Sequence, residues 1–527
     1  MKILLINPSY MKSPPNDVFF SVTGYTIPHL GLGYVASYLE TAGFDVTVIE
    51  CMAQGISNED IYQLVELNTY KFIGISVYSG NKINSVRILN HIKKKHPDSF
   101  VFFGGYTATL AYTNLLSSNK FLDCCIIGEG EITTLELAKC VERGGTYDDI
   151  SGIAFKKSGE IIVTSPRKLI TDLDTLPFPK RVFYSKRGEA TIVSSRGCLN
   201  SCLYCAINAY YQHSEGKKFR FRTAENIINE IRYMIRENPN IKAIGFYDDN
   251  FLVNTKENNE RINKLINLIR KYNLDYIDYY ITVCADDICL NSNLLILFKE
   301  VGLKRVFVGI ESFVERQLKY YRKKASVNDN IKALRILKEI GLEVSLGFVP
   351  YDPYVTIDEI IKNFTVVKEE NPLDLSVDID MPYSLSSALI AVPDTAFKKE
   401  LEDTNQFVMN DRGYVFINGD VESFYHLKNK WVDSITDLID KLFYLLIARD
   451  HDVEEYERLK ILKAELIKID IDFLLSLCTY VKTEINKREE WNSYLNDWLS
   501  KVEHIQNSFN MAEIKYKGIW ENEYKKI

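Results

Sequence analysis

Three cysteines fall within one short stretch near the middle of the chain, at Cys198, Cys202 and Cys205. Thiolates at this CxxxCxxC spacing suit a 4Fe–4S cube, because each sulfur binds a different iron and the fourth iron is left without a protein ligand. Such an open iron could chelate a small molecule and transfer an electron to it. Zinc sites usually use paired CxxC ligands or histidines, and the only nearby histidine is His213. The triplet therefore predicts an iron–sulfur site.

The composition is that of a globular protein and argues against several classes of partner. A length of 527 residues suggests about two to four domains. The net charge of −7 provides no broad positive field to attract nucleic acid, and no apolar run is long enough to span a membrane. The apolar start is too short for a secretion signal. The scattered cysteines are therefore expected to be reduced, which predicts a cytoplasmic location.

Residues 1–150 alternate short apolar segments with amphipathic ones, which predicts an α/β domain with a parallel sheet. The expected strands are Lys2–Ile6, Asp45–Ile49, Phe72–Ser76, Phe100–Phe103 and Cys124–Ile127, and the expected helices include Gly33–Ala42 and Ile83–Lys95. Ligands on such sheets bind at the carboxyl ends of the strands, where glycines allow close backbone approach. No GxGxxG follows the first strand, so a dinucleotide is not the expected ligand.

Residues 151–188 are predicted to form a linker that contains a β-hairpin. Gly152–Phe155 and Ile161–Thr164 flank a turn, and Pro177 and Pro179 disfavour a helix after it. Farther along, the basic run Lys217–Arg222 either contacts an anion or forms a solvated loop edge.

Strand and helix patterns alternate again over residues 189–400, with about six βα units against the eight of a full barrel. The expected strands are Ala190–Ser194, Ala243–Tyr247, Tyr279–Val283, Arg305–Gly309, Glu343–Phe348 and Ser376–Met381. The expected helices are Ala224–Glu237, Glu257–Tyr272, Ser292–Val301, Ser326–Ile340 and Ile357–Glu370. The cysteine loop follows the first strand, at the end where such barrels form their active sites.

Residues 401–527 have helical periodicity with many aromatic residues and predict a C-terminal helical domain. The expected helices are Trp431–Ala448, Val453–Thr483 and Trp491–Phe509. They either cap the barrel mouth and shape a substrate pocket or have a purely structural role.

The triplet, the partial barrel and the preceding domain together resemble the radical S-adenosylmethionine (SAM) superfamily, and within it the class B enzymes with a cobalamin-binding domain. The matching stretches are Pro28–Leu39, Phe103–Gly105, Ile127–Glu131, Ser194–Cys198, Phe246–Phe251 and Val308–Ser312. The resemblance implies an α/β fold in three parts: an N-terminal Rossmann-like cobalamin-binding domain, a partial (β/α)6 TIM-type radical SAM barrel, and a C-terminal helical domain.

The resemblance also implies roles for particular residues. Cys198, Cys202 and Cys205 would be the catalytic ligands of the cluster, whose free iron chelates SAM. Tyr204 would stack on the adenine of SAM, or serve as a structural aromatic. Three residues would meet the amino group of SAM, through backbone carbonyls or carboxylates: Tyr247, Asp248 and Asp249.

Two further positions have competing interpretations. By the same resemblance, Glu311 would contact the ribose or methionine part of SAM; the alternative is a structural ion pair with Arg305 or Lys304. Arg222 would bind the SAM carboxylate, or else lie on the surface.

Cobalamin would lie against the strand-end loops of the first domain. The residues expected there are Ser9, Tyr78, Ser79, Gly104, Gly105, Gly128 and Glu129. The DxHxxG motif of many cobalamin proteins is absent, as it commonly is in radical SAM relatives, and His29 is expected to pack or to cap a helix. Two turns also depart from the usual pattern: Val349–Tyr354 replaces a Gly-x-Pro-Gly turn, and Val392–Thr395 replaces Pro-Gly-Thr.

The implied activity is reductive cleavage of SAM to a 5′-deoxyadenosyl radical, followed by methylation of an unactivated carbon of a small-molecule or natural-product substrate. Non-methylating rearrangement, cyclisation or epimerisation of a metabolite or peptide would fit the same residues. A cobalamin-binding protein without enzyme activity is the third possibility. The expected partners are the small-molecule or peptide substrate and a flavodoxin- or ferredoxin-type electron donor, without nucleic acid or membrane.

Overall fold

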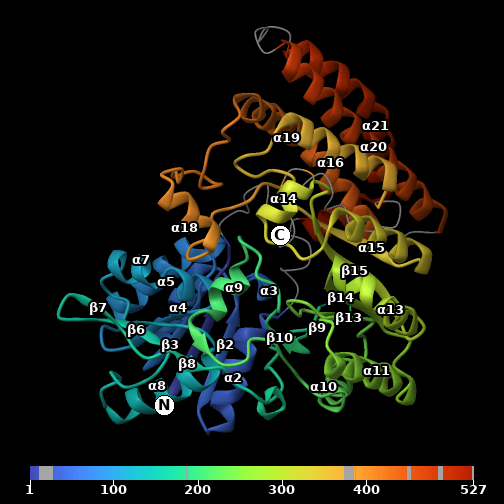
Figure 1. The fold of residues 1–527 in the computed structure, drawn as a ribbon. Helices are drawn as coiled ribbons and strands as arrows, with labels where there is room; N and C mark the ends of the chain where they lie inside the picture. Colours follow the sequence, from blue (N-terminus) through green and yellow to red (C-terminus); the bar gives the residue numbers. More distant parts are fainter. Residues whose placement is uncertain are drawn as a thin grey trace. The chain divides into compact units, whose positions relative to one another are not determined.

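The computed structural model describes residues 1–10, 28–185, 188–372, 385, 387–447, 453–484 and 491–524. The chain forms two compact units (Figure 1). The first unit contains residues 1–282, 300–303 and 392–400, and the second contains residues 283–299, 304–391 and 401–527. Among the described helices, none combines the length and the apolar character that crossing a membrane requires.

The first unit begins with a seven-stranded sheet of order β2-β1-β3-β4-β5-β6-β7. Its parallel strands are β1 (Lys2–Asn7), β2 (Asp45–Glu50), β3 (Phe72–Ser76), β4 (Phe100–Gly104) and β5 (Cys124–Ile126). The predicted parallel sheet is therefore confirmed. The predicted hairpin also forms, as β6 (Ile153–Lys157) and β7 (Glu160–Val163), but it continues this sheet as an antiparallel edge.

Alternating side chains of the buried strands point to two apolar cores. Leu4 and Ile6 of β1 lie in the core formed with α4 (Asn58–Leu67), α5 (Lys82–Lys95) and α7 (Tyr112–Ser118). The neighbouring residues of β1, Ile3 and Leu5, lie in the core formed with α2 (Leu30–Thr41) and α8 (Gly130–Arg143). Helices thus cover both faces, so the loops at the strand ends are where a ligand has access.

Three parallel barrel-type strands follow in the first unit: β9 (Glu189–Ile192), β13 (Ala243–Phe246) and β14 (Asp278–Cys284), with β13 in the middle. The helices α10 (Ala224–Glu237) and α11 (Lys256–Lys271) alternate with them and pack on each other. Between β9 and α10, β10 (Ser195–Arg196) pairs with β12 (Arg220–Phe221) and brackets the cysteine loop.

The second unit contains two parallel strands, β15 (Leu303–Glu311) and β16 (Glu343–Phe348), which pair with each other. Its shorter helices are α12 (Ala285–Leu290), α13 (Ser292–Lys299), α14 (Glu315–Tyr320), α15 (Val327–Ile340) and α16 (Ile357–Glu370). The long helices α19 (Gly419–Ile447), α20 (Val453–Glu484) and α21 (Trp491–Tyr524) confirm the helical C-terminal region. The sixth predicted strand, Ser376–Met381, lies outside the described residues.

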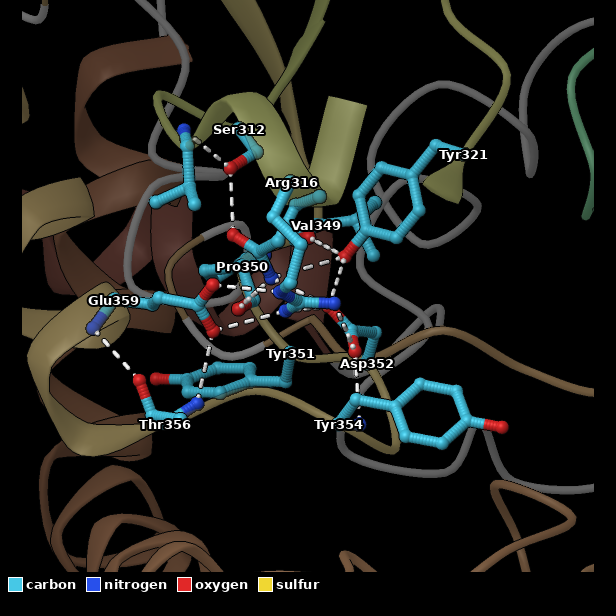
Figure 2. Close-up of polar contacts among 12 residues, drawn as sticks. Ser312, Arg316, Tyr321, Val349, Pro350, Tyr351, Asp352, Tyr354, Thr356 and Glu359 are labelled. Carbon is cyan, nitrogen blue, oxygen red and sulfur yellow. Dashed lines mark hydrogen bonds and ion pairs between the residues drawn. The ribbon is translucent and has the colours of Figure 1, made fainter. Parts of the chain in front are cut away.

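The turn Val349–Tyr354 after β16 is held by a charged network (Figure 2). The buried Asp352 accepts hydrogen bonds from Arg316 Nη2 at 2.9 Å and Gln317 Nε2 at 2.8 Å. Arg316 also donates to Glu359 at 2.6 Å, and Asp352 accepts from the backbone N–H of Tyr354 at 2.9 Å. These residues, which we call the Asp352 cluster (Arg316, Gln317, Asp352 and Glu359), satisfy the polar groups of a turn that contains no glycine.

Candidate active site

The cysteine loop leaves β10 through a glycine that the backbone requires. Gly197 has φ +86°, and a Cβ at this position would lie 2.2 Å from the carbonyl oxygen of Lys218. The backbone N–H of Asn200 donates to Cys198 Sγ at 3.4 Å, and that of Cys205 donates to the Cys202 carbonyl at 3.2 Å. The loop is therefore compact, and all three cysteines are partly exposed.

The arrangement of these sulfurs fits a cluster better than a single ion. Among the described residues, Cys198, Cys202 and Cys205 do not bring three ligand atoms within 4.8 Å of one another. A cube with one iron for each sulfur requires such a spread. Burial raises the pKa of Cys205 to about 11, so bound iron would be needed to hold this thiol as a thiolate. His213, the histidine that the sequence offers as a zinc partner, is hydrogen-bonded to Asp394.

A later segment of the same unit, Val392–Glu400, packs on the cysteine loop, and we call this segment the strap. The backbone N–H of Phe397, in α18 (Ala396–Asp403), donates to the carbonyl of Leu203 at 3.0 Å. Asp394 has φ +62°, in the left-handed region that favours glycine. Its carboxylate contacts His213 and accepts from Gln212 Nε2 at 3.0 Å. The departure Val392–Thr395 thus adds a side-chain anchor for the segment that follows the cysteines.

The two acidic residues after β13 have different surroundings. Asp248 is buried and accepts hydrogen bonds from the backbone N–H groups of Ser194 and Ser195 at 2.7 and 3.0 Å. Asp249 accepts from the Gly197 N–H at 2.8 Å, and burial raises its pKa to about 6. Asp248 is therefore occupied with the backbone of β10, whereas Asp249 lies at the start of the cysteine loop.

A cavity of about 440 Å³ lies within the first unit, at the carboxyl ends of its parallel strands. Seven of the predicted site residues line it: Tyr78, Gly104, Gly105, Gly128, Glu129, Tyr247 and Asp249. Loops of the N-terminal sheet and residues beside the cysteine loop therefore share one cavity. The sequence prediction did not include several polar and aromatic residues that also line it, among them Tyr34, Glu50, Tyr106, Glu131, Arg196 and Tyr210.

The lining is suited to a cobalamin, whose amide-fringed ring supplies donors and acceptors. Asn7 Oδ1 and Thr134 Oγ1 both belong to lining residues, are buried, and have no hydrogen-bond partner among the described residues. A ligand with amide groups could satisfy them. At Gly104 an added Cβ would meet nothing within 4 Å, so backbone alone forms the wall at this position and leaves room for a ligand.

His29 and Glu50 organise the polar side of this cavity. His29 caps α2, because its Nδ1 accepts from the Leu32 N–H at 2.9 Å, which confirms the predicted capping role. Burial lowers the pKa of His29 to about 4, so the ring is neutral and its Nε2–H donates to the hydroxyl of Tyr78. Glu50 accepts from Asn7 Nδ2 at 2.8 Å and from the His29 N–H at 2.9 Å, and burial raises its pKa to about 7.

Four charged residues form a nearly buried network beside the cavity, which we call the Arg196 cluster (Glu129, Glu131, Arg196 and Arg220). Arg196 donates to Glu129 Oε1 at 3.0 Å and to Glu131 Oε1 at 2.6 Å. Arg220 donates to Glu129 Oε2 at 3.0 Å. Burial alone would raise the pKa of Glu129, but Arg196 and Arg220 outweigh it and lower that pKa. The basic run Lys217–Arg222 therefore contributes an internal ion pair.

Other predicted site residues lie away from this cavity lining. Arg222 is buried and donates to Glu230 at 2.5 Å and to the Val193 carbonyl at 2.9 Å, so the surface alternative for it is wrong. Ser79 begins a short 3-10 helix, and the carbonyl of Ser9 accepts from Asn84 at 2.8 Å.

Glu311 belongs to the second unit and is described there by itself. It has φ +64° at a bulge that ends β15, and its carbonyl accepts from the Val349 N–H at 2.8 Å. Its carboxylate pairs with Lys323 at 3.2 Å, while Arg305 pairs with Glu343. The structure thus shows an ion pair, with a partner other than the two that we predicted.

Comparisons with known proteins agree with this geometry. Residues 192–365 match the model of the radical SAM superfamily, and residues 17–138 match that of the B12 binding domain. A structure of the cobalamin-dependent SAM radical enzyme OxsB is similar in fold, with a TM-score of 0.77 over 98% of this chain and 81% of that chain at 18% identity.

Curated relatives cover much of the chain. An uncharacterized methyltransferase of Pyrococcus horikoshii is 25% identical over 85% of this chain and 93% of its own length. An anaerobic magnesium-protoporphyrin IX monomethyl ester cyclase of Synechocystis is 24% identical over 64% of this chain and 66% of its own. The hopanoid C-3 methylase of Methylococcus capsulatus is 26% identical over 73% of this chain and 71% of its own. With its cysteine loop and its strand-end cavity in one unit, the chain belongs to the cobalamin-binding radical SAM enzymes.

Proposed function

We propose that this enzyme methylates an unactivated carbon of a small-molecule substrate. One observation carries the proposal: the loops of the B12-type sheet and Asp249, which is bonded to the residue before Cys198, line the same cavity. A methyl carrier and a radical source could therefore meet there. The names of two relatives, a methyltransferase and a methylase, support methyl transfer.

We assign the cluster to Cys198, Cys202 and Cys205. When bound, the cluster and SAM supply hydrogen abstraction from the substrate, and cobalamin supplies the methyl group. Asp248 holds the two backbone N–H groups before the loop, and the strap at Phe397 supports the loop from another side. The protein thus contributes orientation, which lowers the entropic barrier to reaction.

The remaining predicted SAM contacts fall into two groups. Asp249 and Tyr247 line the cavity and are assigned to the amino group of SAM. The contact of Tyr204 with the adenine remains a prediction. Arg222 donates to Glu230, to Asn226 and to the Val193 carbonyl, so we assign it a supporting role. Glu311 remains a prediction for the ribose or methionine part.

We assign cobalamin to the cavity wall formed by Tyr78, Gly104, Gly105 and Gly128, with Asn7 and Thr134 as additional hydrogen-bonding residues. Ser9, Ser79 and a direct contact from Glu129 remain predictions. The predicted domain limits, at residues 150, 188 and 400, also remain predictions.

Radical SAM enzymes require a reductant and a substrate. A flavodoxin- or ferredoxin-type donor and a cytoplasmic location are the finer expectations for this chain. Non-methylating carbon-skeleton chemistry is the second candidate, because the cyclase among the relatives is named for a ring closure.

A substrate-independent experiment tests methyl transfer. The anaerobically reconstituted protein would be incubated with dithionite, hydroxocobalamin and SAM labelled in its methyl group. We expect both 5′-deoxyadenosine and label in the corrinoid. Formation of 5′-deoxyadenosine without labelled corrinoid would favour the non-methylating candidate. Failure to cleave SAM at all would contradict both.

A further inference from the structure

The Arg196 cluster joins two loops that serve different cofactors in the function proposed above. Glu129 lies in the connection between β5 and α8 and Glu131 in the first turn of α8, within the segment Gly128–Glu131, whereas Arg196 lies two residues before Cys198. The contacts link positions that are 65 and 67 residues apart in the chain. All three of these side chains also line the cavity. The guanidinium group of Arg196 therefore connects the segment Gly128–Glu131, beside the proposed cobalamin site, to the cysteine loop.

The chemistry of the bridge makes it rigid. Arg196 directs one nitrogen to each of two carboxylates, and a planar guanidinium fixes both directions at once. The exposed fractions of the side chains are 13% for Arg196, 6% for Glu129 and 4% for Glu131. Charge-assisted hydrogen bonds shielded from water are short and strongly directional.

Glu129 has little capacity left for a ligand. Its two oxygens accept from Arg196, from Arg220 Nη1 at 3.0 Å and from the Ile170 N–H at 3.0 Å. Arg220 Nη2 lies 2.9 Å from Oε1 as a further ion-pair contact. Both oxygens of its carboxylate are therefore held by the protein. Gly128, directly before it, has φ +79° and donates its N–H to Thr109 at 3.1 Å, so the whole loop is tied to side chains of the protein.

Resting on the proposed function, we propose that Arg196 is a positioning residue that fixes the cysteine loop against the segment Gly128–Glu131 at the start of α8. It thereby sets the separation and orientation of the cluster and the corrinoid. Tyr106 and Tyr210, whose rings lie 4.7 Å apart, provide a second contact, between the helix α6 (Tyr106–Leu110) after β4 and the helix α9 (Ala206–Tyr211) after the cysteines. Without Arg196, that contact would hold the two parts together but leave the loops free to shift.

Electron paramagnetic resonance measures this geometry directly. The reduced cluster and cob(II)alamin each carry an unpaired electron, so their magnetic coupling depends on distance and orientation. Holoenzyme loaded with iron, sulfide and hydroxocobalamin would be reduced with dithionite. We expect one well-defined coupling in the wild type and a broadened coupling in Arg196→Lys, because an ammonium group cannot reproduce the fork to both carboxylates. Glu131→Gln, which keeps the side-chain volume, should show a smaller broadening.

Arg181→Lys is the matched control. Arg181 is also nearly buried, pairs with Glu230 at 2.6 Å, and does not belong to the cavity lining. We expect its coupling to equal that of the wild type. A second measurement compares the label recovered in the corrinoid with the amount of 5′-deoxyadenosine formed. This ratio should fall about tenfold or more in Arg196→Lys while 5′-deoxyadenosine still forms, because a displaced corrinoid slows methyl transfer from SAM more than it slows SAM cleavage.

The outcomes separate this proposal from the proposed function. Wild-type coupling in both Arg196→Lys and Glu131→Gln would overturn it. Loss of cluster or corrinoid from both variants, with the fold retained, would also overturn it, because a positioning residue leaves each site able to bind its cofactor. Wild-type protein that binds no corrinoid would instead refute the proposed function, and this inference with it.

Discussion

The Arg196 cluster of the first unit and the Asp352 cluster of the second unit contain the same kinds of residue but have different roles. Both contain arginine shared between two carboxylates. The Asp352 cluster satisfies the backbone of its own turn, through Tyr354 and Pro350. The Arg196 cluster also satisfies backbone groups, at Ile170, but its arginine joins two segments that line one cavity. The comparison teaches that the segments a charged network connects, and not its burial or strength, indicate whether it stabilises a fold or positions a site.

The largest expected difference between the units concerns their cysteines. Cys202→Ala should abolish cluster binding and 5′-deoxyadenosine formation from SAM, because one iron corner loses its only protein ligand. Iron analysis and product chromatography under anaerobic conditions would measure both. Cys289→Ala is the control, since Cys289 is also partly exposed but lies in the second unit. Equal iron content in the two variants would show that the cysteine loop does not bind the cluster.

The second prediction separates stability from cofactor binding. Asp352→Asn should lower the free energy of unfolding by about 3 kcal/mol, because it leaves charged and polar partners around a buried position incompletely paired. Urea denaturation would measure this loss. Iron content and cobalamin affinity should stay at wild-type values in the folded variant. A selective loss of either cofactor without a loss of stability would contradict the role that we give to the Asp352 cluster.

The third prediction uses pH to test the cavity of the first unit. The pKa of Glu50 is raised from 4.5 to about 7, so the folded chain holds an extra proton between these values. The free energy of unfolding should therefore fall as pH rises through this window, by up to about 3 kcal/mol, and then level off. Urea midpoints at several pH values would show this slope.

Glu50→Gln supplies the comparison for the pH experiment, because a neutral amide has no proton to lose. The contribution of Glu50 to the slope should disappear in this variant, while the contributions of other groups remain. An unchanged pH dependence would mean that Glu50 ionises without cost in the folded protein.

The smallest effect is expected from a substitution that adds one methyl group to the cavity wall. Gly104→Ala adds a Cβ that meets no protein atom within 4 Å, so stability should change by less than about 0.5 kcal/mol. Cobalamin should nevertheless bind about tenfold more weakly, by spectral titration, because the methyl group occupies ligand space. Gly419→Ala in the second unit, which also has nothing within 4 Å, is the control and should bind normally. Equal affinity in both would place the corrinoid elsewhere.

The sequence predicted the elements whose signals are local. Strand β3 and helices α10 and α16 have the predicted bounds, because an apolar run or a helical period shows itself within a few residues. The cysteine spacing is also local and needed no fold to be recognised. The hairpin was predicted correctly as a hairpin, but its pairing with β5 depends on a distant strand and had no local signal.

The placement of the charged residues was decided only by the tertiary structure. Glu129 was predicted as a corrinoid contact and Arg222 as a SAM or surface residue, yet both are held by buried ion pairs with the protein. From the sequence, Arg196 was assigned no role. Two acidic residues beside glycines in Gly128–Glu131, and an arginine beside Gly197, were a signal that could have suggested an ion pair. Residue types and their spacing can be read from the sequence alone, and they were sufficient to predict the cofactors and the fold class. A charge acquires its partner only when folding brings distant segments together and removes them from water, as it does for Arg220 and Glu129 across 91 residues.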